Sequence, residues 1–195
     1  MTARNYSLSV ITIVSGLPRS GTSLMMQMLA AGGMAVLTDC ERKPDADNPR
    51  GYYEWEPAKL LPMQPQRIDE AEGKVVKVIS QLLLSLPAGR NYRVIFMERP
   101  LPEVLASQEE MLRRQGKTDS LSSDLLTSAF KDHLRQVRAW LEARTDIAVC
   151  RVGYRKLVTE PSAITQAVRD FLARDLNVEA MTRQVDPTLY RNRLP

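Results

Sequence analysis

Residues 16–23 (GLPRSGTS) constrain the fold more than any other segment, because they join two runs of opposite character. The run before them, 8–14, is rich in β-branched residues and typical of a strand, whereas 22–31 consists of helix formers with apolar residues on every side. In a glycine loop between a strand and a helix, successive backbone N–H groups point at one anion, and the helix N-terminus adds positive potential. The segment therefore predicts a phosphate-binding loop that leads into a buried helix.

The rest of the chain alternates between strand-like and helix-like segments. Residues 92–97 are nearly all apolar, as in strands of a parallel sheet covered on both faces. The alternation predicts an α/β fold of the P-loop NTPase type: one three-layer domain over 1–195, with a central, mostly parallel sheet of about four to five strands and helices on both faces. The segment 39–51 is polar and is expected to be an irregular functional loop, and the tail, 175–195, has no clear pattern. Further strands are expected at 36–37, 74–79 and 147–152, and helices near 54–61 and at 101–115, 121–144 and 161–173.

Composition and charge exclude several classes of protein. The 195 residues are 44% hydrophobic and 26% charged, as in one ordinary globular domain. Two cysteines and one histidine are too few for a structural zinc site, and no metal site is predicted. The net charge of +4 contains no block of like charges, which argues against a nucleic-acid partner. The apolar run at the amino terminus is too short for a signal peptide or a membrane span, so we expect a cytoplasmic protein.

The loop residues themselves resemble a known motif. Pro18, Arg19, Ser20, Gly21, Thr22 and Ser23 match the Pro-Lys/Arg-Ser-Gly-Thr-Thr/Ser loop of the sulfotransferases, which cradles the 5′-phosphosulfate of 3′-phosphoadenosine-5′-phosphosulfate (PAPS). The arginine form is most similar to the tyrosylprotein and bacterial branches of that family. The resemblance implies that Arg19 contacts the sulfuryl group and that 20–23 hold the 5′-phosphate.

A second motif follows the strand at 92–97. Arg99 stands at the expected carboxyl end of that strand, where open α/β sheets bind ligands, and Ser107 follows eight residues later in a helix. The pair is similar to the arginine and serine that bind the 3′-phosphate of PAPS in sulfotransferases. The glycine-rich arginine motif that closes this site in the cytosolic branch is not evident, and Arg183, Arg191 and Arg193 are possible replacements.

A third match concerns the proton acceptor. The segment from Lys77 to Ile79 is similar to the Lys-Thr-His of the cytosolic sulfotransferases, but Ile79 stands in the place of the catalytic histidine and cannot accept a proton. Lys77 either steadies the bridging oxygen of the donor or is a strand lysine that faces solvent. His133, the single histidine, lies among apolar residues at helical spacing and is predicted to be a helix-packing residue.

Carboxylates are therefore the candidates for the general base. Tyrosylprotein sulfotransferases carry a catalytic glutamate in an acidic segment after the loop helix, and residues 39–42 (DCER) resemble that place. The resemblance makes Glu41 the first choice, with Asp39 and Glu54 as rivals in the same loop region. Apolar neighbours would raise the pKa of such a carboxyl group and help it to accept a proton.

Together these motifs predict a sulfotransferase that transfers a sulfuryl group from PAPS to a hydroxyl or amine of a small-molecule or peptide acceptor, without a metal. Two alternatives remain. One is a phosphate-loop kinase or nucleotide hydrolase using Mg-ATP, favoured by Glu98 at the end of an apolar strand but disfavoured by Thr22, which stands where those enzymes carry lysine. The other is a non-catalytic nucleotide-binding module, because Ile79 replaces a catalytic residue. No pattern specifies an oligomeric state.

Overall fold

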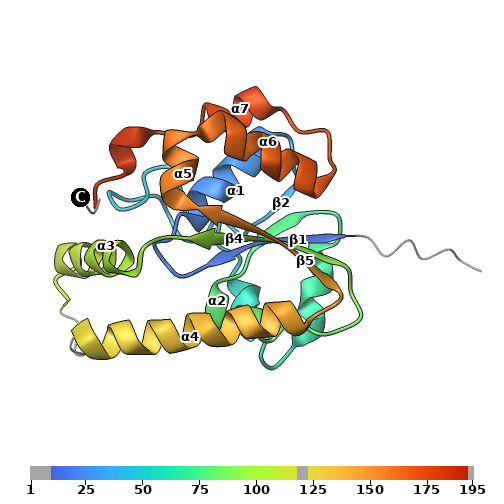
Figure 1. Cartoon of the computed structure of the whole chain (residues 1–195), viewed down its shortest axis with the longest axis horizontal. Coiled ribbons are helices and arrows are strands. Elements are labelled where there is room, and N and C mark those ends of the chain that lie inside the picture. The colour runs from blue at the N-terminus through green and yellow to red at the C-terminus, as the bar shows by residue number, and fades with distance from the viewer. Residues whose placement is uncertain (1–9, 118–122, 193–195) are drawn as a thin grey trace, which may run out of the picture.

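The centre of the protein is a five-stranded sheet in which all strands are parallel, in the order β2-β3-β1-β4-β5 (Figure 1). The computed structural model describes residues 10–117 and 123–192, and it confirms the expected α/β architecture with a parallel central sheet. The strands are β1 (Ile11–Gly16), β2 (Val36–Leu37), β3 (Val75–Lys77), β4 (Tyr92–Glu98) and β5 (Ile147–Gly153).

Helices cover both faces of this sheet (Figure 1). Helices α1, α5, α6 and α7 lie on one face, α2 and α4 lie on the other, and α3 projects beyond the edge at which the strands end. The helices are α1 (Thr22–Ala31), α2 (Ser80–Leu83), α3 (Leu101–Arg114), α4 (Ser123–Ala143), α5 (Tyr154–Thr159), α6 (Pro161–Leu172) and α7 (Val178–Thr182), with 3₁₀ helices at Glu56–Leu60, Pro65–Ala71 and Pro187–Leu189. Within the described ranges, every helix is too short or too polar to cross a bilayer.

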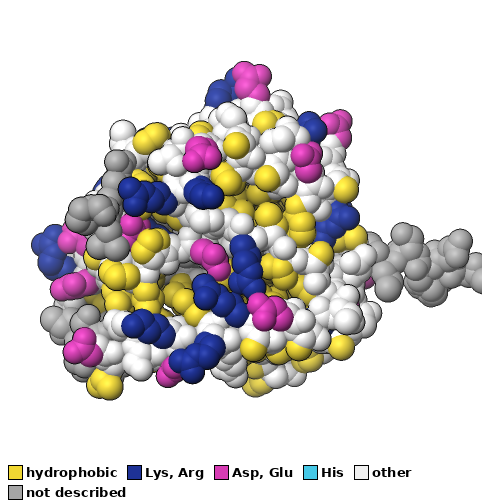
Figure 2. Space-filling model, viewed as in Figure 1, with side chains coloured by type: hydrophobic (Ala, Val, Ile, Leu, Met, Phe, Trp, Pro, Cys, Tyr) yellow, Lys and Arg dark blue, Asp and Glu magenta, His cyan; other side chains and the backbone are white. Residues whose placement is uncertain are grey.

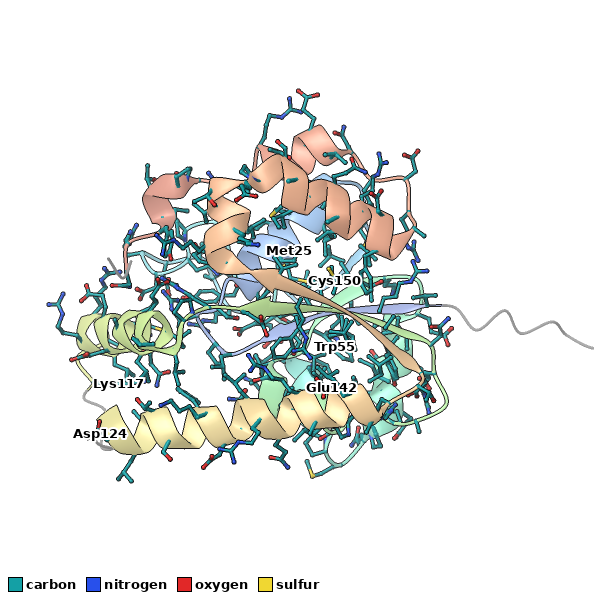
Figure 3. The ribbon with its side chains drawn as sticks, in the orientation of Figure 1. Met25, Trp55, Lys117, Asp124, Glu142 and Cys150 are labelled. Carbon is teal, nitrogen blue, oxygen red and sulfur yellow. The ribbon has the colours of Figure 1, made fainter. Side chains whose placement is uncertain are left out.

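The sheet separates two hydrophobic cores, because successive side chains of a strand point to opposite faces. In β1, Val14 packs into the core beneath α1, whereas Ile13 packs into the core on the side of α4. Met25 and Trp55 belong to these two cores and lie on opposite sides of the sheet (Figure 3). Burial on both faces explains why the sequences of β1 and β4 are almost continuously apolar.

The order of the strands determines where a ligand can bind. The chain runs from β1 to β2 and β3 on one side and then crosses to β4 on the other side of β1. In open α/β sheets, ligands bind outside the carboxyl ends of the strands at such a change of direction. Gly16 pairs with Met97 at the end of β1 and β4, and Val14 pairs with Lys77 at the end of β3.

Several expected elements differ in detail from those observed. The helix expected near 54–61 is a single 3₁₀ helix, Glu56–Leu60, with proline in its first turn. The tail that carried no clear pattern contains α7 and the last 3₁₀ helix. Residues 8–9 of the first expected strand, 121–122 of the long helix and Arg193 lie outside the described residues.

On the face seen in Figure 2, acidic and basic side chains are interspersed, without an extended patch of one sign.

Candidate active site

The glycine loop lies at the carboxyl end of β1 and caps α1. Gly16 and Gly21 have φ values of 147° and 101°, and Gly21 is the N-cap residue of α1. A Cβ atom at Gly16 would lie 2.6 Å from the Met97 carbonyl oxygen, and one at Gly21 would overlap the Tyr154 ring. Side chains at these positions are excluded by both conformation and space, so the loop can approach the end of the sheet only with glycine at both sites.

A cavity of about 460 Å³ opens over this loop and the ends of β1, β3 and β4. Its wall includes Pro18, Arg19, Gly21, Thr22 and Ser23 of the loop, in keeping with an anion site at the start of α1. Seven Arg and Lys side chains line the cavity, against four Asp and Glu side chains. The cavity therefore favours an anionic ligand.

The hydroxyl of Ser20 lies just behind the cavity wall. The residue is 1% exposed, and its Oγ has no hydrogen-bond partner within the part of the chain that the structure describes. A buried hydroxyl without a partner destabilises a protein by about 1–3 kcal/mol. The hydroxyls of Thr12 and Ser15 in β1 are likewise buried without a partner among the described residues.

Arg19 and Ser107, which lie 88 residues apart in the sequence, meet in the cavity. Arg19 Nε donates to Ser107 Oγ at 3.0 Å, and Arg19 Nη2 donates to the Asp47 carbonyl at 3.4 Å. Burial lowers the pKa of Arg19, and the negative charge of Asp47 opposes this effect. A guanidinium has so high a pKa that it stays charged, so Arg19 places a fixed cation beside the loop.

Arg99 also reaches the cavity, but its side chain is only 7% exposed and each of its nitrogen atoms has a partner within the protein. Nε donates to Glu103 at 2.9 Å, Nη1 to the Arg19 carbonyl at 3.1 Å and Nη2 to the Asn192 carbonyl at 2.9 Å. Tyr190 donates its hydroxyl to Glu103 at 2.8 Å. Arg99 thus joins α3, the glycine loop and the carboxyl-terminal segment.

Lys77 is buried at 6% exposure and lines the cavity, so it is not a strand lysine that faces solvent. Its Nζ donates to the Tyr52 carbonyl, lies 3.4 Å from Ser23 Oγ and lies 3.5 Å from Glu54 Oε1. Burial lowers the pKa of Lys77 to about 8, and the Glu54 carboxylate opposes the shift. The amine therefore loses its proton not far above neutral pH.

Of the three candidate carboxylates, only Glu54 lines the cavity. It forms an ion pair with Arg42 at 3.2 Å in addition to its contact with Lys77. Glu41 is exposed and does not line the cavity. The Asp39 carboxylate accepts hydrogen bonds from the backbone N–H groups of Glu41 and Glu56 and holds the loop instead.

Some of the remaining candidates from the sequence line the cavity, and others do not. Ile79 lines the cavity, in keeping with its place in the Lys-Val-Ile segment. His133 does not; its Nε2 lies 2.9 Å from Ser80 Oγ and connects α4 with α2, which agrees with a packing role. Arg191 lines the cavity and Arg183 does not. Glu98 forms ion pairs with arginines of α4 and β5 and stands apart from the cavity.

The sequence offered Tyr52 as either a pocket-lining residue or ordinary packing, and it lines the cavity, donating its hydroxyl to Asp45 and stacking its ring under the Arg42 guanidinium at 3.4 Å. Three other lining residues, Arg42, Asp47 and Arg114, were not identified from the sequence; Arg114 pairs with Asp47 at 2.7 Å. They come from the irregular loop and the far end of α3, and only the general rule that loops at the carboxyl edge form the site could have indicated them. The described residues hold no cluster of three or more Cys, His, Asp or Glu side chains placed to bind a metal ion.

The fold matches that of sulfotransferase domains of known structure. A sulfotransferase domain from the curacin biosynthetic pathway aligns over 96% of this chain and 93% of its own length, with a TM-score of 0.55 and 14% identity. A sulfotransferase domain from the olefin synthase of Synechococcus PCC 7002 aligns over 95% and 88%, with a TM-score of 0.53 and 15% identity. A sugar kinase from Janibacter aligns over 91% and 96% with a TM-score of 0.42 and 13% identity, a likeness too low to carry an argument.

Searches of family models and of curated proteins found no match. At these identities the structural likeness defines the class of fold and not the reaction. The chain is an α/β protein with a sulfotransferase-like fold.

Proposed function

We propose that this protein is a sulfotransferase that uses PAPS as its donor and a hydroxyl or amine of a small molecule or peptide as its acceptor. The observation that carries the proposal is the meeting of two separate motifs, since Arg19 of the glycine loop donates to Ser107 of α3 inside a positively charged cavity. The sulfotransferase-like fold supports the same function.

The residues around the cavity fit the anionic donor. The backbone N–H groups of the loop and the N-terminus of α1 would hold the 5′-phosphate, together with the hydroxyls of Ser20, Thr22 and Ser23. Arg19 would neutralise charge on the transferring sulfuryl group, and Ser107 would contact the nucleotide part of the donor. PAPS would supply an activated sulfuryl group whose leaving group is a phosphate.

On the acceptor side, Glu54 replaces Glu41 as the proposed general base because it lines the cavity. Glu54 accepts the proton of the acceptor as the new bond to sulfur forms and the bond between sulfur and the bridging oxygen breaks. The Lys77 ammonium, 3.5 Å from Glu54 Oε1, would stabilise negative charge on the bridging oxygen. Arg42 Nη1 contacts the same oxygen, Glu54 Oε1, at 3.2 Å and orients the carboxylate.

The alternatives give different results in a binding experiment. Calorimetric titration with adenosine 3′,5′-bisphosphate in EDTA should show binding in the micromolar range, tighter than that of ATP with Mg²⁺. Arg19→Ala should abolish this binding or weaken it at least tenfold, whereas the exposed Arg174→Ala should leave it unchanged. Binding of Mg-ATP alone would place the kinase first and overturn the proposal.

Transfer of radiolabelled sulfate from PAPS to a panel of alcohols, phenols, sugars, amines and tyrosine peptides then separates an enzyme from a binding module. We expect label to appear in one acceptor class in the wild-type protein and in none with Arg19→Ala. Tight binding of the bisphosphate with no transfer across the panel would favour the non-catalytic module.

A further inference from the structure

A buried network of charged and aromatic side chains supports the glycine loop from behind. Arg99 and Glu103 form an ion pair at 2.9 Å, with side chains only 7% and 2% exposed. The Arg99 guanidinium lies 4.8 Å from the centre of the Tyr154 ring and 5.2 Å from that of Tyr190. The two rings contact each other edge to face, with centroids 5.1 Å apart. The guanidinium is therefore held by hydrogen bonds in its plane and by rings beside it.

The network connects two parts of the cavity wall that are distant in sequence. On one side, Arg99 Nη1 donates to the carbonyl of Arg19, which has a φ of 70°. On the other side, Arg99 Nη2 donates to the carbonyl of Asn192, next to Arg191 in the carboxyl-terminal wall. The rare backbone conformation of Arg19 is thus stabilised by a partner for its carbonyl.

These contacts limit what Arg99 can do for a ligand. To turn its guanidinium toward a phosphate in the cavity, Arg99 would have to break its ion pair with the buried Glu103 carboxylate and its hydrogen bonds to the Arg19 and Asn192 carbonyls. Breaking one partner out of a buried ion pair is strongly unfavourable. An exposed arginine at the end of a strand could turn to bind a phosphate. The Arg99 side chain is only 7% exposed, although it reaches the cavity wall.

We propose that Arg99 is a positioning residue. It supports nucleotide binding by holding Arg19 and residues 186–192 in place, rather than by binding the 3′-phosphate directly. Glu103 and Tyr190 are positioning residues of the same network, because they fix the guanidinium and tie the carboxyl-terminal segment to α3. The inference rests on the proposed function for the choice of nucleotide. It departs from the role that the sequence resemblance implies for Arg99.

Two nucleotides that differ only in the 3′-phosphate test this role. The affinities of adenosine 3′,5′-bisphosphate and adenosine 5′-monophosphate are measured for the wild type, Arg99→Lys, Glu103→Gln and Tyr190→Phe. A positioning role predicts that each substitution weakens both nucleotides by the same factor, of fivefold or more, so that their ratio is unchanged. A ratio that collapses in Arg99→Lys, with affinity for the monophosphate retained, would overturn the proposal.

Hydrogen exchange of the free protein provides a readout that does not depend on the nucleotide. Glu103→Gln and Tyr190→Phe should speed the exchange of backbone amides in 186–192 at least tenfold. The matched controls are Glu109→Gln, an exposed carboxylate of the same helix, and Tyr92→Phe, whose buried hydroxyl bonds to Pro87 away from the cavity; both should leave the segment unchanged.

The two arms separate failure of this inference from failure of the proposed function. If the wild type binds neither nucleotide, the proposed function fails, and faster exchange in the two variants still supports the positioning role. Unchanged exchange in both variants overturns the role, whichever nucleotide binds. Tyr190→Phe removes a single hydroxyl and keeps the ring packed, so it tests the network without a cavity in the core.

Discussion

The proposed general base is the sharpest question at the scale of single residues. Glu54→Gln should reduce sulfuryl transfer at least a hundredfold, a larger factor than any loss of affinity for adenosine 3′,5′-bisphosphate, because it removes the proton acceptor but keeps the shape. Glu41→Gln should retain transfer, since this side chain stands outside the cavity. Rates of labelled transfer, measured beside calorimetric affinities, decide between them. The opposite pattern would return the role to Glu41.

Lys77 predicts a dependence of ligand affinity on pH. Its pKa is lowered to about 8 by burial, so its cation is present below pH 8 and is lost as the pH rises further. Affinity for adenosine 3′,5′-bisphosphate should therefore fall severalfold between pH 7 and pH 9. Lys77→Met should bind more weakly at pH 7 and lose most of this pH dependence. If titrations across the range give parallel curves for the two proteins, Lys77 does not act on the nucleotide.

Gly21 tests the packing of the loop. Gly21→Ala would add a side chain that overlaps the Tyr154 ring, in a backbone conformation with φ of 101°. Gly89→Ala is a matched control, because Gly89 also has a positive φ, of 79°, but has open space around its Cβ position. We expect Gly21→Ala to lower the free energy of unfolding in urea by about 1–3 kcal/mol more than the control, the usual cost of overpacking. Equal losses would mean that backbone strain alone requires glycine.

At the scale of elements, the sequence predicts the sheet better than the segments that complete the site. Strands β1 and β4 are apolar on both faces because each is buried between helices, and that pattern is local. The path of the irregular loop depends instead on distant partners, such as the bond from Lys77 to the Tyr52 carbonyl. Neither propensity nor spacing encodes such contacts, so Glu54 could not be chosen over Glu41 before the structure was known.

A substitution at the contact between α2 and α4 can distinguish a packing role of His133 from a catalytic role. His133 Nε2 lies 2.9 Å from Ser80 Oγ, and the Ser80 hydroxyl is buried. His133→Ala should lower the free energy of unfolding by about 0.5–1.5 kcal/mol, because it removes one hydrogen bond of the buried Ser80 hydroxyl, which keeps its bond to Gln81 Oε1 at 3.3 Å. Nucleotide affinity and transfer should stay within twofold of the wild type. A loss of transfer at full stability would give the histidine a part in the reaction.

At the scale of the whole molecule, the cavity brings together parts of the chain that are far apart in sequence. The glycine loop, the irregular loop, α3 and the carboxyl-terminal segment all contribute to its wall. Arg50 further ties the irregular loop to the carboxyl-terminal segment, because its Nη1 donates to the Gln184 carbonyl at 2.7 Å. A ligand that fills this cavity therefore contacts segments from both ends of the chain at once.

This arrangement predicts that the nucleotide stabilises the entire fold. A ligand at one hundred times its dissociation constant adds about 2.7 kcal/mol to the free energy of unfolding if it binds only the folded state. For a domain of this size, that corresponds to a rise in Tm of about 5–10 °C. Scanning calorimetry with adenosine 3′,5′-bisphosphate in EDTA should show this rise as one shifted transition, and Arg19→Ala should lose it. A larger shift with Mg-ATP would indicate that the cavity serves a nucleotide triphosphate, and two separate transitions would mean that its walls unfold independently.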